Sequence, residues 1–434
     1  MISSRSFFLA AKLLSGKRNI LKKRNILGAV LGIGLSLIPL IVVLEISSGM
    51  IEGITERYME IGSYHLQIKP FFNMDQDKQD STIQIIKSLK DVKSVFPVVN
   101  GVGLAYSENG RTGISFKALP EDYLEIDKSA AKFIKIESGK FKLDTNDSAM
   151  LSSEVARILD VVPGDRIKIL TARKIPGRRP VLKPSYLTVN GIFSTGYYEL
   201  DALSIYINID KGKKLFTDKN SLIIGVKLFN PFENIKEKTK EVRNILGTGY
   251  SVHNWYNLEQ SMIDSFNTTR TILLFITILI VIVAAMNISS AIVMLVMEKE
   301  EAIAMLKSTG VPSALITRTF VYMGFIIGIS GTFIGLVLGL LAAININGII
   351  HLSEAVINKF YYYIQILLSP LLILKERNLV IIDTAYYLDK IPIKLNLINI
   401  LLISTLTILL SVFAAYIPAK RAGKLKPMDI LRKH

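Results

Sequence analysis

The chain has 434 residues, of which 50% are hydrophobic and 20% are charged, and its mean hydropathy is positive at +0.39. This balance excludes a chain that lies wholly within a membrane and favours apolar spans joined to a water-soluble part. The chain has no cysteine, which excludes disulfides, cysteine-bound zinc and thiol nucleophiles.

The net charge of +16 is concentrated at the two ends of the chain. Residues 1–25 hold seven basic residues and no acid, and residues 419–434 hold six basic residues and one acid, so the ends contribute +7 and +5. Basic flanks of membrane spans stay in the cytoplasm, so we expect both termini there. This distribution gives little support to a nucleic-acid partner, which needs a basic face with aromatic residues on a soluble domain.

Four long runs without charge predict four membrane-spanning helices, at 26–48, 271–297, 319–350 and 395–418. An even number of spans agrees with two termini on one side of the membrane. Residues 1–25 are expected to form a basic amphipathic helix on the inner membrane surface, and residues 419–434 a basic cytoplasmic tail.

Glu45 lies just past the apolar part of the first span. Two interpretations are open: a polar group at the mouth of a substrate cavity, or a carboxylate that reaches water at the outer interface, which is the commoner case.

Residues 49–270 are predicted to form an α+β domain outside the membrane. Short strand-like runs alternate with helical patterns, in which apolar residues recur at spacings of three and four. The predicted strands are Ser94–Val99, Val102–Tyr106, Gly113–Leu119, Ile167–Thr171, Leu187–Phe193, Ser204–Ile209 and Ile223–Leu228, and the predicted helices are Ser81–Leu89, Ser152–Leu159 and Pro231–Leu246.

One segment of this domain, residues 171–185 (TARKIPGRRPVLKPS), holds three prolines and five basic residues between two strand-like runs. Prolines lower the entropy lost when an extended arm docks, so the segment suits an arm held out for a partner. A solvated loop that only links strands is the equal alternative.

Residues 298–318 separate the second and third spans and begin with EKEEAIAMLKSTG. Three glutamates in the first turn, Lys307 in the last turn, Gly310 and then Pro312 predict a short helix with a defined start and stop. We expect the apolar residues Ala302, Ile303, Met305 and Leu306 to share one side of it.

The third span carries glycines at spacings of four, three, four and four: Gly324, Gly328, Gly331, Gly335 and Gly339. Such a stripe lets helix backbones approach closely, so we expect it to pack against another helix. Residues 351–394 are expected to form an outer loop, in which 360–374 is apolar but too short and too interrupted by Pro370 to be a fifth span. An interfacial or partner-facing segment is expected there instead, with its tyrosines at head-group depth.

The sequence contains no motif for nucleotide binding through a P-loop, no zinc-protease or nucleophile-elbow motif, and only four scattered histidines. We therefore expect no catalytic activity, no metal site and no cofactor in this chain.

Two motifs point to a family: E-x-x-x-A-I-x-x-L-K-x-x-G after the second span, from Glu298 to Gly310, and P-A-x-R-A-x-x-L-x-P after the fourth, from Pro418 to Pro427. With the order of one span, a large outer domain and three spans, the chain resembles the FtsX-like, MacB-type permeases of ABC systems. Three further segments, 9–14, 41–50 and 386–396, make it similar to the LolC/LolE membrane subunits of the lipoprotein-releasing system.

The resemblance implies a membrane subunit that takes lipoproteins from the inner membrane and passes them to a LolA-like periplasmic carrier. It also implies a second permease subunit, LolE-like or a copy of this chain, and a separate LolD-like ATPase that binds ATP and magnesium.

The family's site residues transfer onto three sets of positions in this chain. The ATPase-coupling residues are Glu298, Glu300, Glu301, Ala302, Ile303, Met305, Leu306 and Gly310. The carrier-binding hook is Lys174, Ile175, Pro176, Gly177, Arg178, Arg179, Pro180 and Val181, and the acyl chains are expected against Ile33, Leu37, Leu40, Leu44, Phe266 and Phe275.

Two other functions remain open. A MacB-like or FtsX-like exporter of peptides or small molecules would share the fold but not need the hook. A transmembrane regulator of a periplasmic enzyme would have no substrate cavity that opens to lipid.

Overall fold

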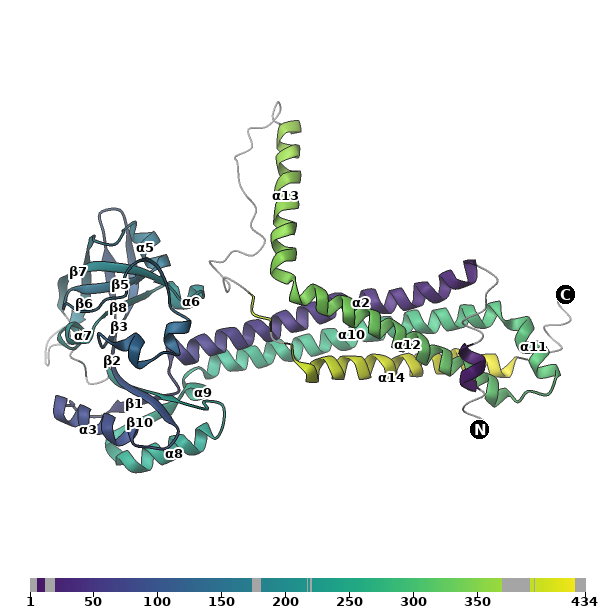
Figure 1. Ribbon diagram of the computed structural model, residues 1–434, viewed down its shortest axis with the longest axis horizontal. Helices are drawn as coiled ribbons and strands as arrows, with labels where there is room; N and C mark the ends of the chain where they lie inside the picture. The colour runs from purple at the N-terminus through teal and green to yellow at the C-terminus, as the bar shows by residue number, and fades with distance from the viewer. Residues whose placement is uncertain are drawn as a thin grey trace. The chain divides into compact units, whose positions relative to one another are not determined.

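The computed structural model describes residues 6–11, 20–173, 181–216, 218, 221–368, 391–393 and 395–425. These residues divide into two compact units (Figure 1). One unit is helical and takes its residues from both ends of the chain and from 266 onward, while the other contains residues 51–265 and is α+β. The predicted fold class is confirmed.

Four helices of the described chain are long and apolar enough to cross a membrane, as predicted. They are α2 (Ile20–Arg57), whose last residues belong to the α+β unit, α10 (Gln260–Glu298), α12 (Ser313–Ile344) and α14 (Leu397–Lys424). A short helix at residues 6–11 precedes them, and α11 (Glu300–Ser308) links α10 to α12.

The connection after α12 differs from the loop expected for 351–394. Its first part is a helix, α13 (Ile346–Leu368), separated from α12 by Asn345 alone. The interruption expected at Pro370 lies outside the described residues.

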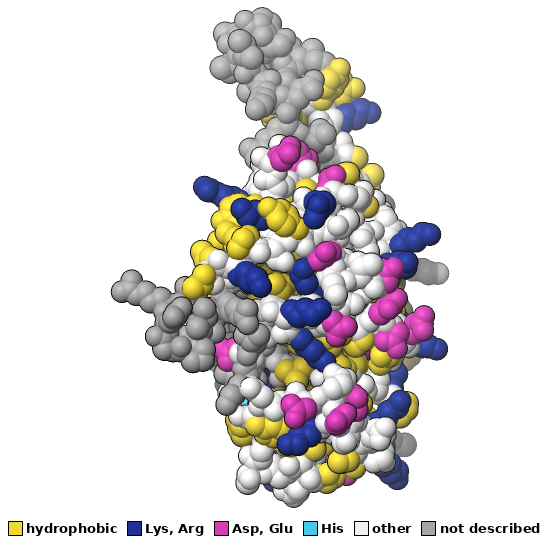
Figure 2. Space-filling model, turned by 90° about the vertical axis from the view of Figure 1, so that its left-hand side faces the viewer, with side chains coloured by type: hydrophobic (Ala, Val, Ile, Leu, Met, Phe, Trp, Pro, Cys, Tyr) yellow, Lys and Arg dark blue, Asp and Glu magenta, His cyan; other side chains and the backbone are white. Residues whose placement is uncertain are grey.

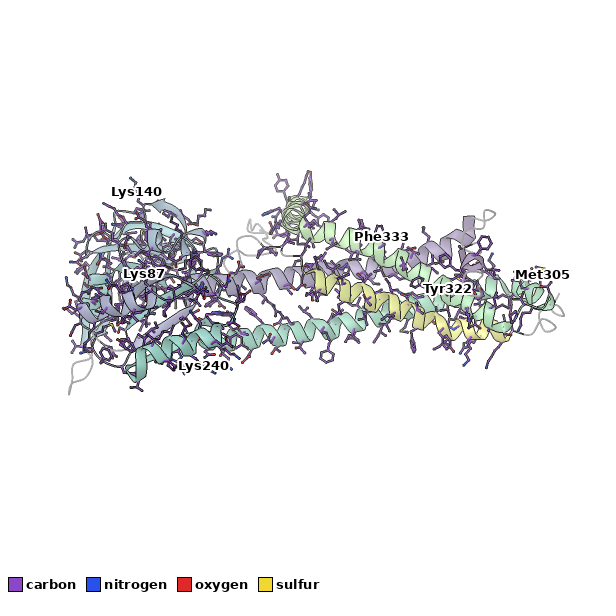
Figure 3. The ribbon with its side chains drawn as sticks, turned by 60° about the horizontal axis from the view of Figure 1, so that its bottom comes forward. Lys87, Lys140, Lys240, Met305, Tyr322 and Phe333 are labelled. Atoms are coloured by element: carbon purple, nitrogen blue, oxygen red, sulfur yellow. The ribbon has the colours of Figure 1, made fainter. Side chains whose placement is uncertain are left out.

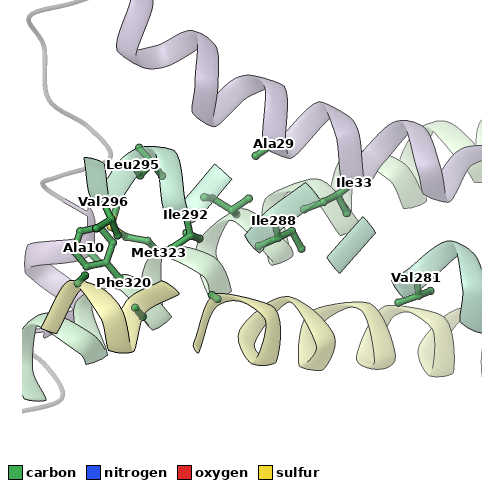
Figure 4. Packing of buried hydrophobic residues seen from close by; sticks show 14 of the residues in the cluster. Ala10, Ala29, Ile33, Val281, Ile288, Ile292, Leu295, Val296, Phe320 and Met323 are labelled. Carbon is green, nitrogen blue, oxygen red and sulfur yellow. The ribbon is translucent and has the colours of Figure 1, made fainter. Parts of the chain in front are cut away.

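A continuous hydrophobic core fills the helical unit, with residues from each of the four long helices (Figure 4). Its members recur along each helix at spacings of three and four, which is the pattern that buries one stripe of a helix. The contributions include Ile33 and Leu37 from α2, Ile288, Ile292 and Leu295 from α10, Phe320, Met323 and Ile327 from α12, and Ile403, Ala415 and Ala419 from α14.

The glycine stripe of α12 contacts two partners. A Cβ atom at Gly324 would lie 2.3 Å from Ala415 Cβ of α14, and one at Gly328 would lie 2.6 Å from Ser411 Cβ. Farther along, Gly331, Gly335 and Gly339 face Ile33, Leu37 and Ile41 of α2, with the same close spacing. The stripe therefore brings two neighbouring helices against α12 at different heights.

Six strands of the α+β unit form a closed barrel. Each pairs with the next in the order β2 (Val92–Tyr106), β3 (Arg111–Leu119), β8 (Ser204–Asn208), β5 (Ser148–Ser152), β7 (Val181–Ser194) and β6 (Arg166–Arg173), and β6 pairs back with β2. Alternate side chains point inward, so Phe116, Leu151, Ile167, Leu187 and Ile207 are buried. The helices α5 (Ser153–Leu159) and α7 (Ile209–Leu215) pack on this core.

Three further strands extend from β2 in the order β9 (Leu222–Leu228), β1 (Leu66–Pro70) and β10 (Tyr250–Asn254), and β4 (Lys135–Gly139) pairs with β7. The helices α3 (Gln76–Lys87) and α8 (Ile235–Leu246) cover the extension. Single turns complete the unit: α4 (Tyr123–Ile126), α6 (Tyr198–Asp201), α9 (Trp255–Leu258), the 3₁₀ turns Ala130–Lys132 and Gly247–Gly249, and a π-helical turn, Tyr58–Gly62. Acidic and basic side chains are interspersed over the face shown in Figure 2.

Two lysines, the buried Lys227 and the half-buried Lys117, hold the π-helical turn that follows α2. Lys227 on β9 donates to the Glu60 carbonyl oxygen at 2.6 Å and to the Glu60 carboxylate at 2.5 Å. Lys117 on β3 donates to the carbonyls of Ile61 and Gly62 at 2.5 and 3.1 Å. Cations are favourable at the carbonyl end of a helix, so these contacts fix the end of α2 to the sheet.

His65 is held neutral beside this cluster. Its Nδ1 accepts a hydrogen bond from the Leu228 backbone N–H at 2.7 Å, and its Nε2 lies 3.1 Å from Glu60 Oε1, to which it donates. Burial lowers the pKa of His65 below the ordinary value of 6.5, and the hydrogen bond to Glu60 opposes this effect only in part.

We expect the five glycines of α12 to tolerate no side chain. Gly331→Leu would place atoms onto Ile33 and should lower the thermal stability of the purified protein, at a cost of about 1–3 kcal/mol. Gly28→Leu is the matched control, because a Cβ at Gly28 meets no atom within 4 Å. Thermal unfolding followed by size-exclusion chromatography measures both, and equal losses would show that the stripe is not a packing face.

The folded α+β unit should lose stability in mild acid because of His65. The unfolded chain binds a proton near pH 6.5 and the folded chain only at lower pH, so the free energy of unfolding falls as pH drops below about 6.5, by at most about 1.4 kcal/mol per pH unit. His65→Asn retains an acceptor for the Leu228 N–H but does not titrate. Denaturant unfolding between pH 5 and 7.5 should therefore show a shallower pH dependence in the variant, and an unchanged dependence would contradict the assignment.

Candidate functional site

The helix α11 ends where the sequence pattern predicts but begins later: Glu298, expected in its first turn, is the last residue of α10, and only Glu300 and Glu301 lie in the first turn of α11. Gly310 has a φ of +89°, a conformation that favours glycine, and it places two backbone hydrogen bonds across the last turn. They run from Gly310 N to Lys307 O at 3.0 Å and from Val311 N to Leu306 O at 3.1 Å, the paired bonds of a Schellman motif. The chain then turns sharply into α12.

One residue of α11 does not lie on the apolar side where the sequence pattern placed it. Ile303 and Ala304 are buried in the helical unit, and Ala302 and Leu306 are partly buried. Met305, expected on the same side, is 59% exposed and projects outward (Figure 3). Met305 lies two residues past Ile303, about 200° around the helix, so it shares the outward face with Glu301.

Lys307 ties α11 to the end of α14. Its Nζ donates to the carbonyl oxygens of Gly423 at 2.9 Å and Leu425 at 2.6 Å, which lie at the carbonyl end of that helix. A cation at this position satisfies carbonyls that have no partner within the helix and complements its dipole. The two family motifs, distant in the sequence, therefore meet in space.

The end of α14 also packs directly on the start of α12. A Cβ atom at Gly423 would lie 2.3 Å from Thr317 Oγ1 and 2.9 Å from the Ser313 carbonyl oxygen. Ala419 and Ala422 of the same motif are fully buried. The helices α11, α12 and α14 thus form one joined corner of the helical unit.

An apolar groove of about 610 Å³ lies beside this corner. Phe8 and Leu9 of the first short helix form one side of it, and the other side comes from the turn between α11 and α12. That turn contributes Leu306, Thr309, Gly310, Val311 and Pro312, followed by Leu315 and Ile316.

The expected arm grows from the barrel as a β-hairpin. The strands β6 and β7 stay paired as far as Arg173 and Val181, so the connecting loop is shorter than the 171–185 expected. Residues 174–180, which include all but one of the expected hook residues, lie outside the described residues. Val181 and Leu182 at the loop end of β7, and Tyr186 opposite Lys168 of β6, are exposed.

Of the six residues expected around an acyl chain, Ile33, Leu37 and Leu40 belong to the core of the helical unit and Leu44 packs against it. Ile33 and Leu37 fill the space over Gly331 and Gly335 of α12, because these glycines admit bulky side chains. Phe275 of α10 is 63% exposed. Leu40 is buried in the core, while Leu44 and Phe266 are partly buried.

Glu45 does not reach water, contrary to the interpretation favoured from the sequence. It is 1% exposed, and its carboxylate accepts a hydrogen bond from the Asn396 N–H at 3.1 Å. Gly49, one turn on, packs on the Pro392 carbonyl so closely that a Cβ would lie 1.8 Å from it. Glu45 and Gly49 therefore hold the segment before α14 against α2.

Comparison with known proteins defines the class of this chain. Residues 26–244 match the model of the MacB-like periplasmic core domain, and residues 274–375 match the FtsX-like permease C-terminal region. The chain belongs to this family of permeases, which carry a MacB-like core domain between their first two spans.

Relatives along the full length are more specific. The chain is 26% identical to the lipoprotein-releasing system transmembrane protein LolE of Haemophilus influenzae, over 99% of both chains. It is 25% identical to the LolC protein of Xylella fastidiosa, over 98% of this chain and 97% of the relative. The resemblance to the LolC/LolE subunits is thereby confirmed. A crystal structure of the periplasmic region of MacB from Actinobacillus actinomycetemcomitans covers 46% of this chain and 93% of that region, with 14% identity and a TM-score of 0.30.

Sequence reasoning placed Lys307 at a helix end but gave it no role. Its partners, the carbonyls of Gly423 and Leu425, lie 116 and 118 residues away, and no local pattern indicates them. The sequence offered one indication of this contact: Lys307 belongs to one family motif, and Gly423 and Leu425 belong to the other.

Lys307→Met should loosen this corner without preventing membrane insertion. Two hydrogen bonds from a charged donor are lost, so we expect a drop of about 1.5–3 kcal/mol in the free energy of unfolding. Lys299→Met on the preceding turn is the control. Thermal unfolding of the purified proteins compares them, and equal midpoints would remove Lys307 from the packing of this corner.

Proposed function

We propose that this chain is the permease subunit of an ATP-driven complex that extracts lipoproteins from the inner membrane and hands them to a soluble periplasmic carrier. The full-length similarity to LolE and LolC proteins carries the proposal. The projecting β6–β7 hairpin and the braced helix α11 support it, because release needs both a place for the carrier and a place for an ATPase.

In this proposal both termini and α11 face the cytoplasm, as the basic ends of the chain indicate. The ATPase subunit contacts the outward face of α11 at Glu301 and Met305. Its movement reaches α14 through Lys307 and reaches α12 through Gly423 and the turn at Gly310. ATP and magnesium are bound by that separate subunit, and a second permease subunit, LolE-like or another copy of this chain, completes the complex.

The acyl chains are proposed to lie where α2 faces α10. The residues on this face differ from those first expected, since Ile33 and Leu37 pack against Gly331 and Gly335 of α12. A Cβ at Gly32 would lie 3.9 Å from Asn287 Nδ2 of α10, so the helices approach each other there. We propose that Leu44 and the exposed Phe275 contact the acyl chains.

Depletion of the protein is the direct test of this function. Acylated lipoproteins should accumulate in the inner membrane and disappear from the outer membrane in fractionated cells. Normal lipoprotein sorting, together with new sensitivity to a peptide or small molecule, would favour the exporter instead.

Glu301→Lys should weaken ATPase attachment and transport together. The side chain is exposed, so folding and insertion should be retained. Glu108→Lys in the β2–β3 turn makes the same change of charge on another exposed side chain and serves as the control. Copurification of the ATPase measures attachment, and an undiminished yield with Glu301→Lys would remove α11 from the coupling role.

Replacing residues 174–180 by a short Gly-Ser turn should abolish carrier capture while the complex stays assembled. The replacement preserves the last ladder pair, Arg173 with Val181, and a surface loop contributes little to stability. A photo-crosslinker at Ile175 should capture the carrier in intact cells, whereas one at Glu108 should not. Lipoprotein release at the normal rate by the loop-replaced protein would refute the hook and favour the exporter.

A further inference from the structure

The helix α13 takes part in none of the sites described above. It follows α12 after one residue and belongs to the same compact unit. Two views show that α13 runs across the direction of α12 instead of continuing it (Figures 1 and 3). Since α12 is long and apolar enough to cross a membrane, α13 runs across the direction of a span, at the end of α12 farthest from α11.

One face of α13 is an exposed apolar stripe. Ile349, Leu352, Val356, Phe360 and Tyr363 recur at spacings of three, four, four and three, and all five are exposed, Leu352 by 67%. Asn347, His351, Glu354 and Asn358 lie on the other side of the helix, where His351 Nδ1 lies 3.5 Å from Glu354 Oε2. This is the pattern of an amphipathic helix at an interface.

The stripe follows exposed apolar side chains at the end of α12. Leu341 and Ile344, in the last turn of α12, are about half exposed, and Ile349 begins the stripe just over a turn later. The helix α13 itself is not among the four described helices that are apolar enough to span the membrane. A helix that is amphipathic, runs across the direction of a span and follows its exposed apolar side chains fits the boundary between head groups and acyl chains.

Hydrogen bonds hold the start of α13 to the segment that precedes α14. The Asn347 Nδ2 donates to the Ile391 carbonyl oxygen, and Asn347 Oδ1 accepts from the Ile391 N–H, both at 3.2 Å. The same segment, 391–396, is held to α2 by Glu45 and Gly49 and then enters α14. Asn347 thus ties the start of the polar face to this segment, and the exposed apolar stripe lies on the other side of the helix.

We propose that α13 binds the outer leaflet of the bilayer as an interfacial helix, with the stripe from Ile349 to Tyr363 in the acyl boundary and the face that carries His351 in water. Tyrosines at head-group depth are typical of such positions, and Tyr361, Tyr362 and Tyr363 follow one another here. The bound partner is the phospholipid surface itself. A second copy of the chain is the competing occupant, and the experiment distinguishes the two.

Single cysteines in this naturally cysteine-free chain provide the test. Val356→Cys and His351→Cys, each carrying a nitroxide spin label, are measured in the full chain reconstituted in nanodiscs of phosphatidylethanolamine and phosphatidylglycerol. Oxygen, which concentrates among acyl chains, should relax the label at 356 severalfold more than a water-soluble nickel chelate does. The label at 351 should show the reverse order.

Phe360→Cys repeats the measurement on the stripe in case one variant folds poorly, which size-exclusion chromatography detects. Equal exposure of 356 and 351 to the nickel chelate would place α13 in water and overturn the proposal. Protection of 356 and 360 from both reagents, with spin–spin broadening between copies, would assign the stripe to a second chain. The measurement needs neither ATPase nor lipoprotein, so its result is independent of the proposed function.

Discussion

The close approach of three helices along one glycine stripe is the constraint on which the helical unit depends. Gly324 and Gly328 admit α14, while Gly331, Gly335 and Gly339 admit α2, at spacings where an added Cβ would lie 2.3–3.0 Å from the neighbouring helix. In lipid the hydrophobic effect does not hold helices together, so close packing of this kind must contribute most of the attraction. The stripe also explains why Ile33 and Leu37 are unavailable to a ligand: they complete the packing surface of α12.

The same helix α12 connects the two ends of the unit. Its start carries the Gly310 turn and contacts Gly423 of α14, and its end leads into α13 and the segment that Glu45 holds. When one helix of a tightly packed core shifts, its neighbours move with it as rigid units, because a packed core does not deform continuously. A displacement of α11 is therefore passed to α12 and α14 together, with Lys307 keeping α11 and α14 in step.

The sequence was sufficient for what depends on local chemistry. Runs without charge located the spans, the spacing of glycines located a packing face, and Gly310 before Pro312 located the end of α11. It was insufficient where distant residues meet. Glu45 looked exposed because its donor, the Asn396 N–H, lies 351 residues away, and barrel closure requires β6 to pair with β2, which no local pattern indicates. The helix α13 was not predicted because its first residues continue the charge-free run of the third span, so no local signal marks the break at Asn345.

The closed barrel has a mechanical consequence for the arm it carries. The strand β6 is hydrogen-bonded to β2 on one side and to β7 on the other, and Thr171 pairs with both Gly103 and Lys183. A force that pulls the tip of the hairpin along its strands is thus carried in shear by many ladder bonds at once, where an open sheet edge would peel apart one bond at a time. The arm is consequently stiff toward axial tension and yields more readily to sideways bending beyond the pair of Gly103 with Thr171, where β6 no longer has β2 beside it and pairs with β7 alone.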